Sequence, residues 1–422
     1  MQTSSAILYI GSRLPSRSET FVYGEVIALR SFGVQVLTAS LRPPETGLGA
    51  PELERMAMES IVVYGSLLRL GADVFLELAF HPNITALTFL AALRDSLQKE
   101  AGQVAAIFKI WMQAMAGIAL ARRIRGLGVN RIHCHMAHAT TTVGMYAAMQ
   151  CCIPFSFTGH GADVFRDGSL LKQKLSRAIK VICISRWHRE VYQRIVARPV
   201  DDYPLVRCGV GTDAEYSDFE AQDSHVDAIG DIPMILTVAR LVPKKGVHLL
   251  VRALSRLQRL GRHFRAVVAG AGPELERLQK LADKCGLCGC IEWKGALAHS
   301  EVASLMRETS VFVLPCVIAP DGDRDGIPVV LMEAMAAGVP CISSDFPAIR
   351  ELIEDGVSGR LVPPADVNGL ARAIETLIFD HSLRTHIRSR GREAVQLEFS
   401  SKLNARRLLS ALQIEREAVA CT

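Results

Sequence analysis

Short apolar runs alternate with longer amphipathic stretches along most of this 422-residue chain. Runs of four to six residues rich in Val, Ile, Leu and Ala predict buried strands, because such runs are too short for stable helices. In the first half they are Ala6–Ile10, Val34–Thr38, Arg131–Cys134, Pro154–Thr158, Val181–Ser185 and Val206–Cys208. Helical patterns separate them, the longest at residues 94–126. Strand–helix alternation of this kind predicts a parallel sheet with helices on its faces.

A second alternation runs from Ile235 to about residue 390, after the polar and acidic stretch Glu215–Ile232, which has no periodicity. The length of the chain suits two domains, each with its own core. The last stretch, from Ala394 to Val419, has a helical pattern. We therefore expect a first domain at 1–213, a linker at 214–232, a second domain at 233–392 and a terminal helix at 393–422.

Composition excludes disorder, because 49% of the residues are hydrophobic and only 22% are charged. The net charge of +5 comes from residues 1–213, since the rest of the chain is slightly acidic. A basic first half indicates a domain that faces something anionic. The segment Arg166–Arg198 is rich in Lys and Arg and suits an anionic membrane leaflet or a lipid-diphosphate acceptor. A solvated helix face explains the same segment equally well.

Cysteine usage and the start of the chain predict a cytoplasmic protein. The eleven cysteines are scattered, and no secretory signal pattern precedes them. The apolar stretch Val104–Ala121 is close to the length of a membrane span but contains Lys109 and Gln113. A central lysine costs about 3 kcal/mol in lipid, so we expect a helix of the first domain, at most lying on a membrane surface.

The most informative motif is Asp325-Gly-Ile-Pro-Val-Val-Leu-Met-Glu333. It places one carboxylate on a glycine-containing turn and a second within the first turns of a helix, with Pro328 in the first helical turn. The backbone N–H groups of Gly326, Ile327 and Val329, together with the helix dipole, can hold an anion such as a diphosphate. The two acids are then able to accept hydrogen bonds from neutral hydroxyls. A nucleotide-sugar is a ligand that joins these two chemistries.

A second motif fits the same ligand. The apolar run Ile235–Ala239 is followed by Arg240 and, five residues later, by Lys245. Beyond the carboxyl end of a strand these cations can converge on a diphosphate, arginine as a bidentate clamp and lysine as a point charge. A solvated basic loop is the alternative for this motif taken alone. A further glycine pair, Gly270 and Gly272, follows another apolar run and predicts a tight turn, either beside the nucleotide or purely structural.

Together these motifs resemble a family 4 retaining glycosyltransferase, and in detail the members that build bacterial exopolysaccharides such as colanic acid. The resemblance is specific from Ile235 to about Ala365 and continues in shorter pieces of the first half, such as Ser18–Phe21 and Ser156–Asp163. It implies an α/β protein of the GT-B fold, in which two facing Rossmann-like domains with parallel sheets enclose an interdomain cleft. In that fold the terminal helix crosses back to the first domain.

The resemblance also implies roles for residues. Glu333 would bond the ribose hydroxyls and Asp325 the transferred sugar, although the family usually has Glu in place of Asp325. Arg240 and Lys245 would stabilise the leaving diphosphate. Gly270, Gly272, Gly326, Ile327 and Val329 would belong to the donor site.

In the first half, the resemblance implies that His160 approaches the sugar near the reacting centre, whereas a loop histidine bonded to backbone is the alternative. Asp163 would position the acceptor or cap the following helix. Ser18, Glu19 and Thr20 are further candidates for acceptor contacts, and Ser18 with Phe21 is a candidate helix cap and staple.

No metal and no cofactor is expected. Cys285, Cys288 and Cys290 lack a second ligand pair at zinc spacing, and Asp321, Asp323 and Asp325 lack the glycine and glutamate of a calcium loop. His133, His135 and His138 could be ligands, but they lie at a strand end where the resembling family has an interdomain loop. The donor would be a UDP-, GDP- or ADP-sugar.

The expected activity is transfer of a hexose to a saccharide or lipid-linked saccharide with retention of configuration, in the cytoplasm or at the cytoplasmic face of the inner membrane. A GT-B nucleotide-sugar epimerase and a non-catalytic sugar-nucleotide-binding subunit of a polysaccharide synthesis complex remain alternatives. A dinucleotide oxidoreductase is disfavoured by the paired Arg/Lys and Asp/Glu motifs. No nucleic-acid partner is expected.

Overall fold

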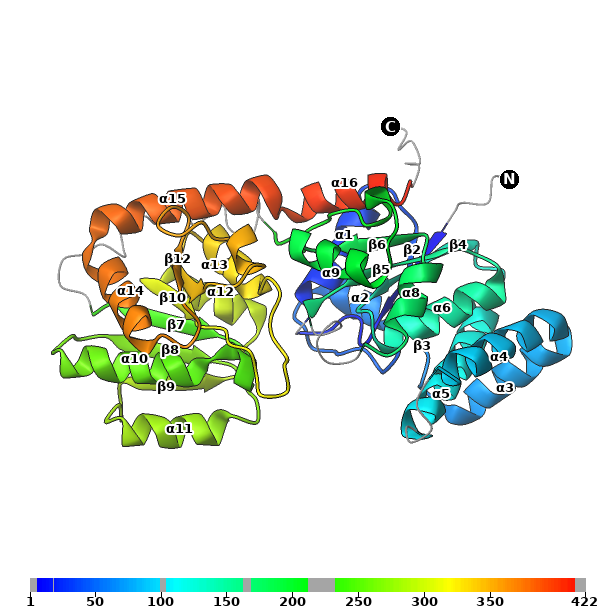
Figure 1. The fold of residues 1–422 in the computed structure, drawn as a ribbon, viewed down its shortest axis with the longest axis horizontal. Coiled ribbons are helices and arrows are strands. Elements are labelled where there is room, and N and C mark those ends of the chain that lie inside the picture. The colour runs from blue at the N-terminus through cyan, green and yellow to red at the C-terminus, as the bar shows by residue number, and fades with distance from the viewer. Residues whose placement is uncertain (1–5, 18, 99–103, 162–167, 212–231, 414–422) are drawn as a thin grey trace. The chain divides into compact units, whose positions relative to one another are not determined.

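The chain folds into two compact α/β units, shown in the computed structural model of Figure 1. The structure describes residues 6–17, 19–98, 104–161, 168–211 and 232–413. The first unit comprises Met1–Arg207 together with Ala405–Thr422, and the second comprises Cys208–Asn404. Each unit holds one six-stranded sheet, so the predicted α/β class is confirmed. The expected linker at 214–232 lies, except for its last residue, outside the described residues.

The first sheet has the strand order β3-β2-β1-β4-β5-β6, and all neighbouring strands are parallel. Its strands are β1 (Ala6–Gly11), β2 (Val36–Ser40), β3 (Ile61–Val62), β4 (Val129–His135), β5 (Phe155–Gly159) and β6 (Lys180–Cys183). The expected strand at Val206–Cys208 is wrong, because only an isolated bridge joins Cys183 to Leu205 there. The order reverses between β1 and β4, which is where open α/β sheets bind ligands.

Helices cover both faces of this sheet. They are α1 (Thr20–Ser31), α2 (Pro51–Glu59), α3 (Leu67–Phe80), α4 (Pro82–Ser96), α5 (Val104–Ile124), α6 (Ala139–Cys151), α8 (Leu171–Arg177), α9 (Arg186–Ile195) and the 3₁₀ turn η1 (Val200–Asp202). The buried faces of α5 and α6 pack on one side of the sheet in one apolar cluster. Helix α1 packs in a second cluster with Ile7 and Tyr9 of β1.

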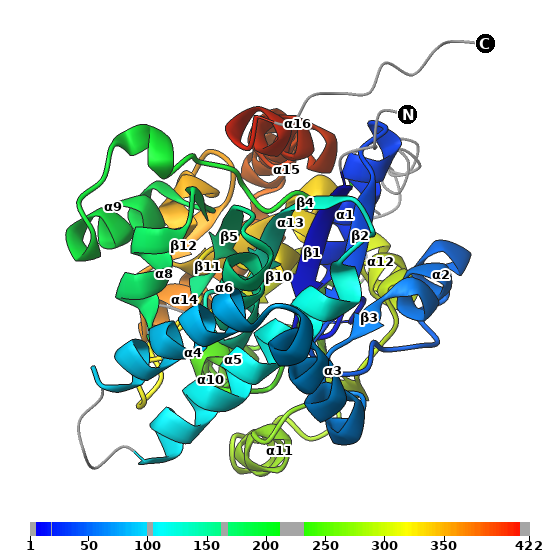
Figure 2. The ribbon, with the colours of Figure 1, turned by 90° about the vertical axis from the view of Figure 1, so that its right-hand side faces the viewer.

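The helical stretch predicted at 94–126 is divided in the structure. Helix α4 ends at Ser96 and α5 begins at Val104, with residues 99–103 outside the described part. Of the described helices, α5 is the one long and apolar enough to cross a membrane by length and composition. Half of its most apolar stretch is buried inside the first unit, as in the core helix of a soluble domain. Helices α3 and α4 pack on α5, and Figure 2 shows the three side by side.

The second sheet repeats the same topology, in the order β12-β11-β10-β7-β8-β9 with parallel neighbours. Its strands are β7 (Met234–Val238), β8 (Arg265–Ala269), β9 (Ile291–Gly295), β10 (Val311–Leu314), β11 (Cys341–Ser344) and β12 (Arg360–Val362). The order reverses between β7 and β10. The loops that follow these two strands therefore meet at one edge of the sheet.

One face of the second sheet carries α10 (Val247–Arg259), α11 (Leu275–Lys284) and α14 (Val367–Phe379), whose apolar sides share a core. Figure 1 shows α12 (His299–Arg307) and α13 (Val329–Ala336) on the opposite face. Two 3₁₀ turns, η3 (Pro243–Lys245) and η4 (Ile349–Glu351), complete the unit.

The expected terminal helix is two helices in the structure, α15 (His381–Glu398) and α16 (Ser401–Ala411), which are interrupted at Phe399 and Ser400. Within α16 and just beyond it, Ala405, Leu408, Leu409 and Leu412 are buried in the cluster of the first unit that contains α1 and β1. The main-chain carbonyl of Leu412 also accepts a hydrogen bond from Arg131. The last part of the described chain therefore belongs to the core of the first unit.

Candidate functional site

The residues of the two strongest sequence motifs meet at the switch point of the second sheet. Arg240 and Lys245 lie on the loop after β7, and Asp325 lies on the loop between β10 and α13. Because β7 and β10 are neighbours, their carboxyl ends bring these loops together. Arg240 is exposed, whereas Lys245 and Asp325 are largely shielded from solvent.

Backbone contacts between the two loops fix the position of the lysines. The N–H of Val317 donates to the carbonyl oxygen of Lys244 at 2.8 Å. Gly246 has a φ of 63°, and a β-carbon there would lie 1.8 Å from the carbonyl oxygen of Pro315. Only glycine allows both this left-handed conformation and this approach. The turn of η3 therefore holds Lys244 and Lys245 against the acidic loop.

Two lysines and two aspartates form a compact charge cluster at this place. Nζ of Lys245 lies 2.7 Å from Oδ2 of Asp325. Nζ of Lys244 lies 3.1 Å from Oδ1 of Asp323 and 3.4 Å from Oδ1 of Asp325. The thiol of Cys316 donates to Oδ2 of Asp325 at 3.5 Å. Asp325 is thus held by three groups from two loops.

The pair of Lys245 and Asp325 stays ionised although it is largely buried. Burial alone would raise the pKa of Asp325, but the ammonium groups of Lys245 and Lys244 outweigh it and lower that pKa from its ordinary value. Burial alone would lower the pKa of Lys245, but Asp325 outweighs it and raises that pKa. Burial and the charge of Asp325 both raise the pKa of the Cys316 thiol, which is therefore a neutral donor. A charged, desolvated cluster of this kind can bind a polar or anionic ligand strongly.

Helix α13 presents its amino end directly after this loop. The helix begins at Val329, and Pro328 is its N-cap in an extended conformation, so the expectation that Pro328 lies inside the first turn is wrong by one residue. Proline offers no side chain to cap the first N–H groups, and no side-chain cap is present. Gly326 and Ile327 form the preceding turn, and Glu333 lies on the second turn of α13, partly exposed. This arrangement keeps the expected donor residues on one short segment.

Gly270 and Gly272 bring the loops after β7 and β8 into direct contact. A β-carbon at Gly270 would lie 1.8 Å from the carbonyl oxygen of Ala239, and one at Gly272 would lie 2.3 Å from that of Leu241. The N–H of Leu241 donates to the carbonyl of Ala271 at 2.9 Å. Both glycines therefore have a structural role that fixes the backbone on either side of Arg240. Contact with a nucleotide stays a prediction.

In the first unit, His160 lies at the end of β5 and is buried among aromatic groups. Its Nε2 lies 3.4 Å from Nδ1 of His135, whose Nε2 lies 2.9 Å from Oε1 of Glu25. The ring of Phe21 packs against His160, with 4.8 Å between ring centroids. His160, His135 and Glu25 thus form a continuous chain of side-chain contacts inside the first unit.

Burial keeps His133 and His160 neutral. It lowers the pKa of His133 to about 3, with a further contribution from His135. Burial, followed by the nearby histidines, lowers the pKa of His160 well below its ordinary value. His133 bonds both ring nitrogens to hydroxyls, at 2.8 Å from Ser156 and 3.0 Å from Thr158. His160 is thus suited to hydrogen bonding rather than to carrying a charge.

The expected acceptor residues are only partly described. Ser18 and Asp163 lie outside the described residues. Glu19 is the N-cap of α1 without a side-chain cap, and Thr20 is the first residue of the helix. The ring of Phe21 contacts His160 and His135, and its expected staple role with Ser18 stays a prediction.

Among the described residues, one group could hold a metal ion by its geometry, namely Glu25, His133 and His135. Each of its ligand atoms already takes part in the hydrogen bonds given above. Asp323 and Asp325, which lie in the loop where no calcium site is expected, form ion pairs with Lys244 and Lys245. The prediction that no metal is needed stays a prediction.

Sequence reasoning missed several members of both clusters. Lys244 and Asp323 are as buried as Lys245 and Asp325, and Cys316 touches Asp325. In the first unit, Glu25 was missed, although it stands between the buried Val22 and Val26 on α1. A lone carboxylate near the apolar face of a helix is a signal for a buried polar contact, because burial of an unpaired charge is costly.

Comparison with known protein families finds a match in the second unit. Residues 218–394 match the family described as "Glycosyl transferases group 1". The second unit carries a group 1 glycosyl transferase domain. The Arg240/Lys245 loop, the acidic loop and α13 all lie inside this glycosyl transferase domain, which confirms the resemblance found in the sequence.

Two relatives of the chain are named for the biosynthesis of the exopolysaccharides colanic acid and amylovoran. The putative colanic acid biosynthesis glycosyltransferase WcaL of Salmonella typhimurium is 40% identical over 180 residues, which cover 42% of this chain and 44% of the relative. The amylovoran biosynthesis glycosyltransferase AmsK of Erwinia amylovora is 32% identical over 262 residues, or 60% of this chain and 62% of AmsK. The chain thus spans less than half the length of WcaL and less than two thirds of AmsK.

Solved structures resemble the whole chain. HepE of Anabaena in complex with UDP-glucose has a TM-score of 0.69 at 18% identity, covering 97% of this chain and 99% of HepE. A sucrose-phosphate synthase from Thermosynechococcus elongatus has a TM-score of 0.72 at 19% identity, covering 97% of this chain and 98% of the synthase. At such identities the likeness shows the fold alone, which is the predicted GT-B fold.

Proposed function

We propose that the protein is a retaining glycosyltransferase that moves a hexose from a nucleotide-diphosphate sugar to a saccharide acceptor in exopolysaccharide biosynthesis. The observation that carries this proposal is the cluster of Lys244, Lys245, Asp323 and Asp325 beside the start of α13, which has no side-chain cap, inside the glycosyl transferase domain. The printed names of WcaL and AmsK support the pathway class. The complex of HepE with UDP-glucose supports a nucleotide-sugar donor. The proposed donor is a UDP-, GDP- or ADP-sugar.

In this proposal, the positively charged groups of the site bind the diphosphate of the donor, and the carboxylates bind its sugars. Arg240 and Lys245 bind the diphosphate together with the N–H groups of Gly326, Ile327 and Val329. When Lys245 turns to the diphosphate, Lys244 remains beside Asp325 and keeps it ionised. Asp325 then accepts hydrogen bonds from the hexose, and Glu333 accepts them from the ribose.

Electrostatic stabilisation carries the reaction in this proposal. The bond between the anomeric carbon and the diphosphate oxygen breaks, and negative charge develops on the leaving oxygen, where fixed cations favour it. The acceptor hydroxyl forms the new bond on the same face and transfers its proton to the leaving phosphate, so that configuration is retained. His160 contributes a hydrogen bond to the sugar near the reacting centre in this scheme.

The acceptor is proposed to be a lipid-linked saccharide, reached from the cytoplasmic side of the membrane. Glu19, Thr20, Ser18 and Asp163 are the proposed acceptor contacts. The chemistry needs no divalent cation in this scheme, because lysine, arginine and helix N–H groups supply the positive charge.

Incubation with separate UDP-, GDP- and ADP-sugars and a bacterial lipid extract tests the proposal. We expect release of nucleoside diphosphate that depends on the lipid extract, together with an acceptor lengthened by one hexose in mass spectra. Conversion of the free nucleotide-sugar without an acceptor would instead indicate an epimerase. Binding of the donor without turnover would indicate a scaffold subunit, and either result contradicts the proposal.

A further inference from the structure

Helices α3 and α4 of the first unit turn apolar side chains outward and polar side chains inward. The exposed residues of α3 recur at helical spacing and include Leu68, at 89% exposed, Phe75, at 69%, and Leu78. On α4 the exposed face includes Leu90, at 59%, together with Leu87, Leu93 and, just beyond the helix, Leu97. The start of α5 adds Val104 and Phe108. This apolar surface of α3, α4 and the start of α5 is called the hairpin surface below.

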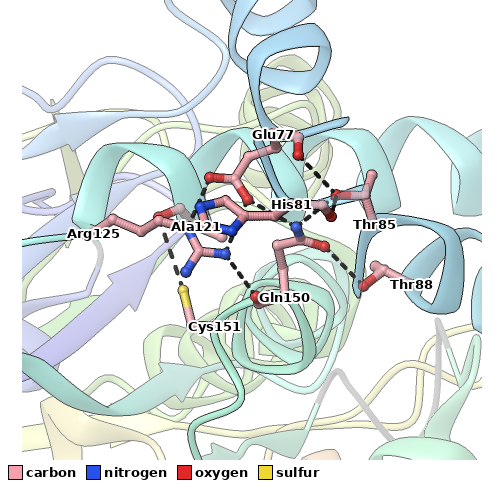
Figure 3. Close-up of polar contacts among 8 residues, drawn as sticks. All are labelled: Glu77, His81, Thr85, Thr88, Ala121, Arg125, Gln150 and Cys151. Carbon is pink, nitrogen blue, oxygen red and sulfur yellow. Dashed lines mark hydrogen bonds and ion pairs between the residues drawn. The ribbon is translucent and has the colours of Figure 1, made fainter. Parts of the chain in front are cut away.

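The inner side of the hairpin is built from polar contacts, shown in Figure 3. Arg125 donates to both carboxylate oxygens of the fully buried Glu77, at 2.8 and 3.0 Å. The amide of Gln150 donates to Glu77 and to Thr85, both at 2.8 Å, and its oxygen accepts from Thr88 at 3.0 Å. These bonds fasten α3 and α4 to α5 and α6 in one orientation. The outward leucines and phenylalanines are therefore fixed on the surface rather than left over from loose packing.

Acidic and basic side chains of the hairpin also have different surroundings. All three acidic residues of α3, α4 and α5 are paired internally, Asp73 with Arg123 at 2.7 Å, Glu77 with Arg125, and Asp95 with Arg177 at 2.7 Å. Among the described residues of these helices, the exposed charged side chains are Arg69, Arg94 and Lys109. Within the described residues of these helices, the exposed side thus combines Leu and Phe with positively charged side chains.

We infer that the hairpin surface docks on an anionic lipid bilayer. Leucine and phenylalanine beside arginine and lysine are the composition of helices that lie in the membrane interface, with their apolar face between headgroups and acyl chains. Helix α4 has fifteen residues and is about 22 Å long, which is too short for the roughly 30 Å core, so the helix lies on the bilayer and does not cross it.

Positive charge makes lipid the better occupant than a second copy of the chain. In a twofold dimer, the same patch faces itself, so Arg69 and Arg94 would face a surface whose exposed charges are all positive. An anionic headgroup layer instead complements the positive charges of Arg69, Arg94 and Lys109. The inference deepens the proposed function, since an enzyme with a lipid-linked acceptor must work at a lipid surface, but its test does not depend on activity.

Flotation with vesicles tests the docking surface directly. We expect the full chain to float with phosphatidylglycerol/phosphatidylcholine vesicles and to bind pure phosphatidylcholine vesicles at least tenfold more weakly. The double variant Phe75→Glu/Leu90→Glu should lose at least tenfold in binding to the anionic vesicles. The matched control Leu260→Glu/Leu397→Glu changes two leucines of similar exposure, 54% and 63%, in the second unit and should bind like the unchanged protein.

Equal binding by both double variants would overturn the inference, as would equal binding to both kinds of vesicle. If the protein does not float but forms a dimer, and Phe75→Glu/Leu90→Glu dissociates this dimer, the surface binds a second copy of the chain. Circular dichroism confirms that each variant is folded. Lys245→Ala should float like the unchanged protein, because docking does not depend on the donor site. If the unchanged protein binds vesicles but fails the transfer assay, the proposed function is rejected and the docking surface stands.

Discussion

Adjacent lysines of one short turn have different surroundings in this protein. Lys244 lies between Asp323 and Asp325, whereas Lys245 contacts Asp325 alone and is under the influence of Arg240. Lys245 can therefore exchange its partner for a diphosphate while Asp325 keeps a counter-ion. In the proposed scheme, Lys244 therefore remains the counter-ion of Asp325 while Lys245 binds the diphosphate.

Substitutions at Glu333 and at Lys245 should change different constants, the dissociation constant of the nucleotide and kcat respectively. We expect Glu333→Ala to weaken nucleotide binding by about tenfold, because one charge-assisted contact to ribose is worth about 1.5 kcal/mol. Lys245→Ala should instead lower kcat by about a hundredfold or more, since it removes charge stabilisation in the transition state. Calorimetric titration with nucleoside diphosphate and steady-state kinetics separate the two effects.

Lys284→Ala, on the exposed last turn of α11, is the matched control for Lys245→Ala and should leave both constants unchanged. If Glu333→Ala and Lys245→Ala both behave like this control, the donor site lies elsewhere in the chain.

The buried histidines make the first unit sensitive to acid. The pKa of His133 is lowered from 6.5 to about 3, so the folded state binds fewer protons than the unfolded state between these values. The stability associated with neutral His133 is complete above pH 6.5 and is lost as the pH falls from there towards 3. Each pH unit in this window costs up to about 1.4 kcal/mol per such histidine.

We expect the urea midpoint of the first unit to be lower at pH 5.5 than at pH 7.5. Tryptophan fluorescence, to which Trp111 of α5 contributes, monitors the unfolding. His133→Gln retains hydrogen-bonding capacity without a titrating group and should show a smaller fall. An equal fall in both proteins would show that other groups control the acid sensitivity.

At the scale of elements, the loop after β7 depends on one glycine. Gly246→Ala should destabilise the second unit by about 2 kcal/mol or more, because the new methyl group meets the carbonyl of Pro315 and the backbone has positive φ. Gly261→Ala has a similar φ of 73° with nothing within 4 Å of its β-carbon, and should cost only about 1 kcal/mol. Chemical denaturation of both variants measures the difference, and equal losses would contradict the close loop contact.

Apolar patterning predicted most of the elements, because a buried strand or helix leaves a clear period in the sequence. Strands β1, β5 and β7 appear within one or two residues of their expected bounds. The two-residue strand β3 was not predicted, since a run so short carries no period. The strand expected at Val206–Cys208 was wrong because apolar residues there are buried without forming a ladder.

Spacing along the chain predicted part of the site. Arg240, Lys245 and Asp325 could be placed at one sheet edge, because the carboxyl ends of neighbouring parallel strands meet. Lys244 and Asp323 could not be distinguished from solvated charges, since their burial depends on the contact between two loops distant in sequence. The outward-facing apolar residues of α3 and α4 were missed for a similar reason: periodicity alone does not say which face of a helix is inside.

At the scale of the whole molecule, the proposed chemistry relies on the charges of the chain itself. We therefore expect hexose transfer to persist after dialysis against EDTA, with less than a twofold change in rate. Plasma mass spectrometry of the dialysed protein checks that no zinc, magnesium or manganese remains. Loss of activity that added metal restores would contradict this scheme and direct attention to Glu25, His133 and His135.

The path of the chain limits how the protein can be divided. The first unit ends at Arg207 but is completed by Ala405, Leu408, Leu409 and Leu412, so its polypeptide is discontinuous. A fragment that stops near residue 211 would leave the apolar sides of α1 and β1 without their cover and should aggregate. Supplying residues 401–413 as a separate peptide, or fusing them to that fragment through a flexible tether, should restore its solubility.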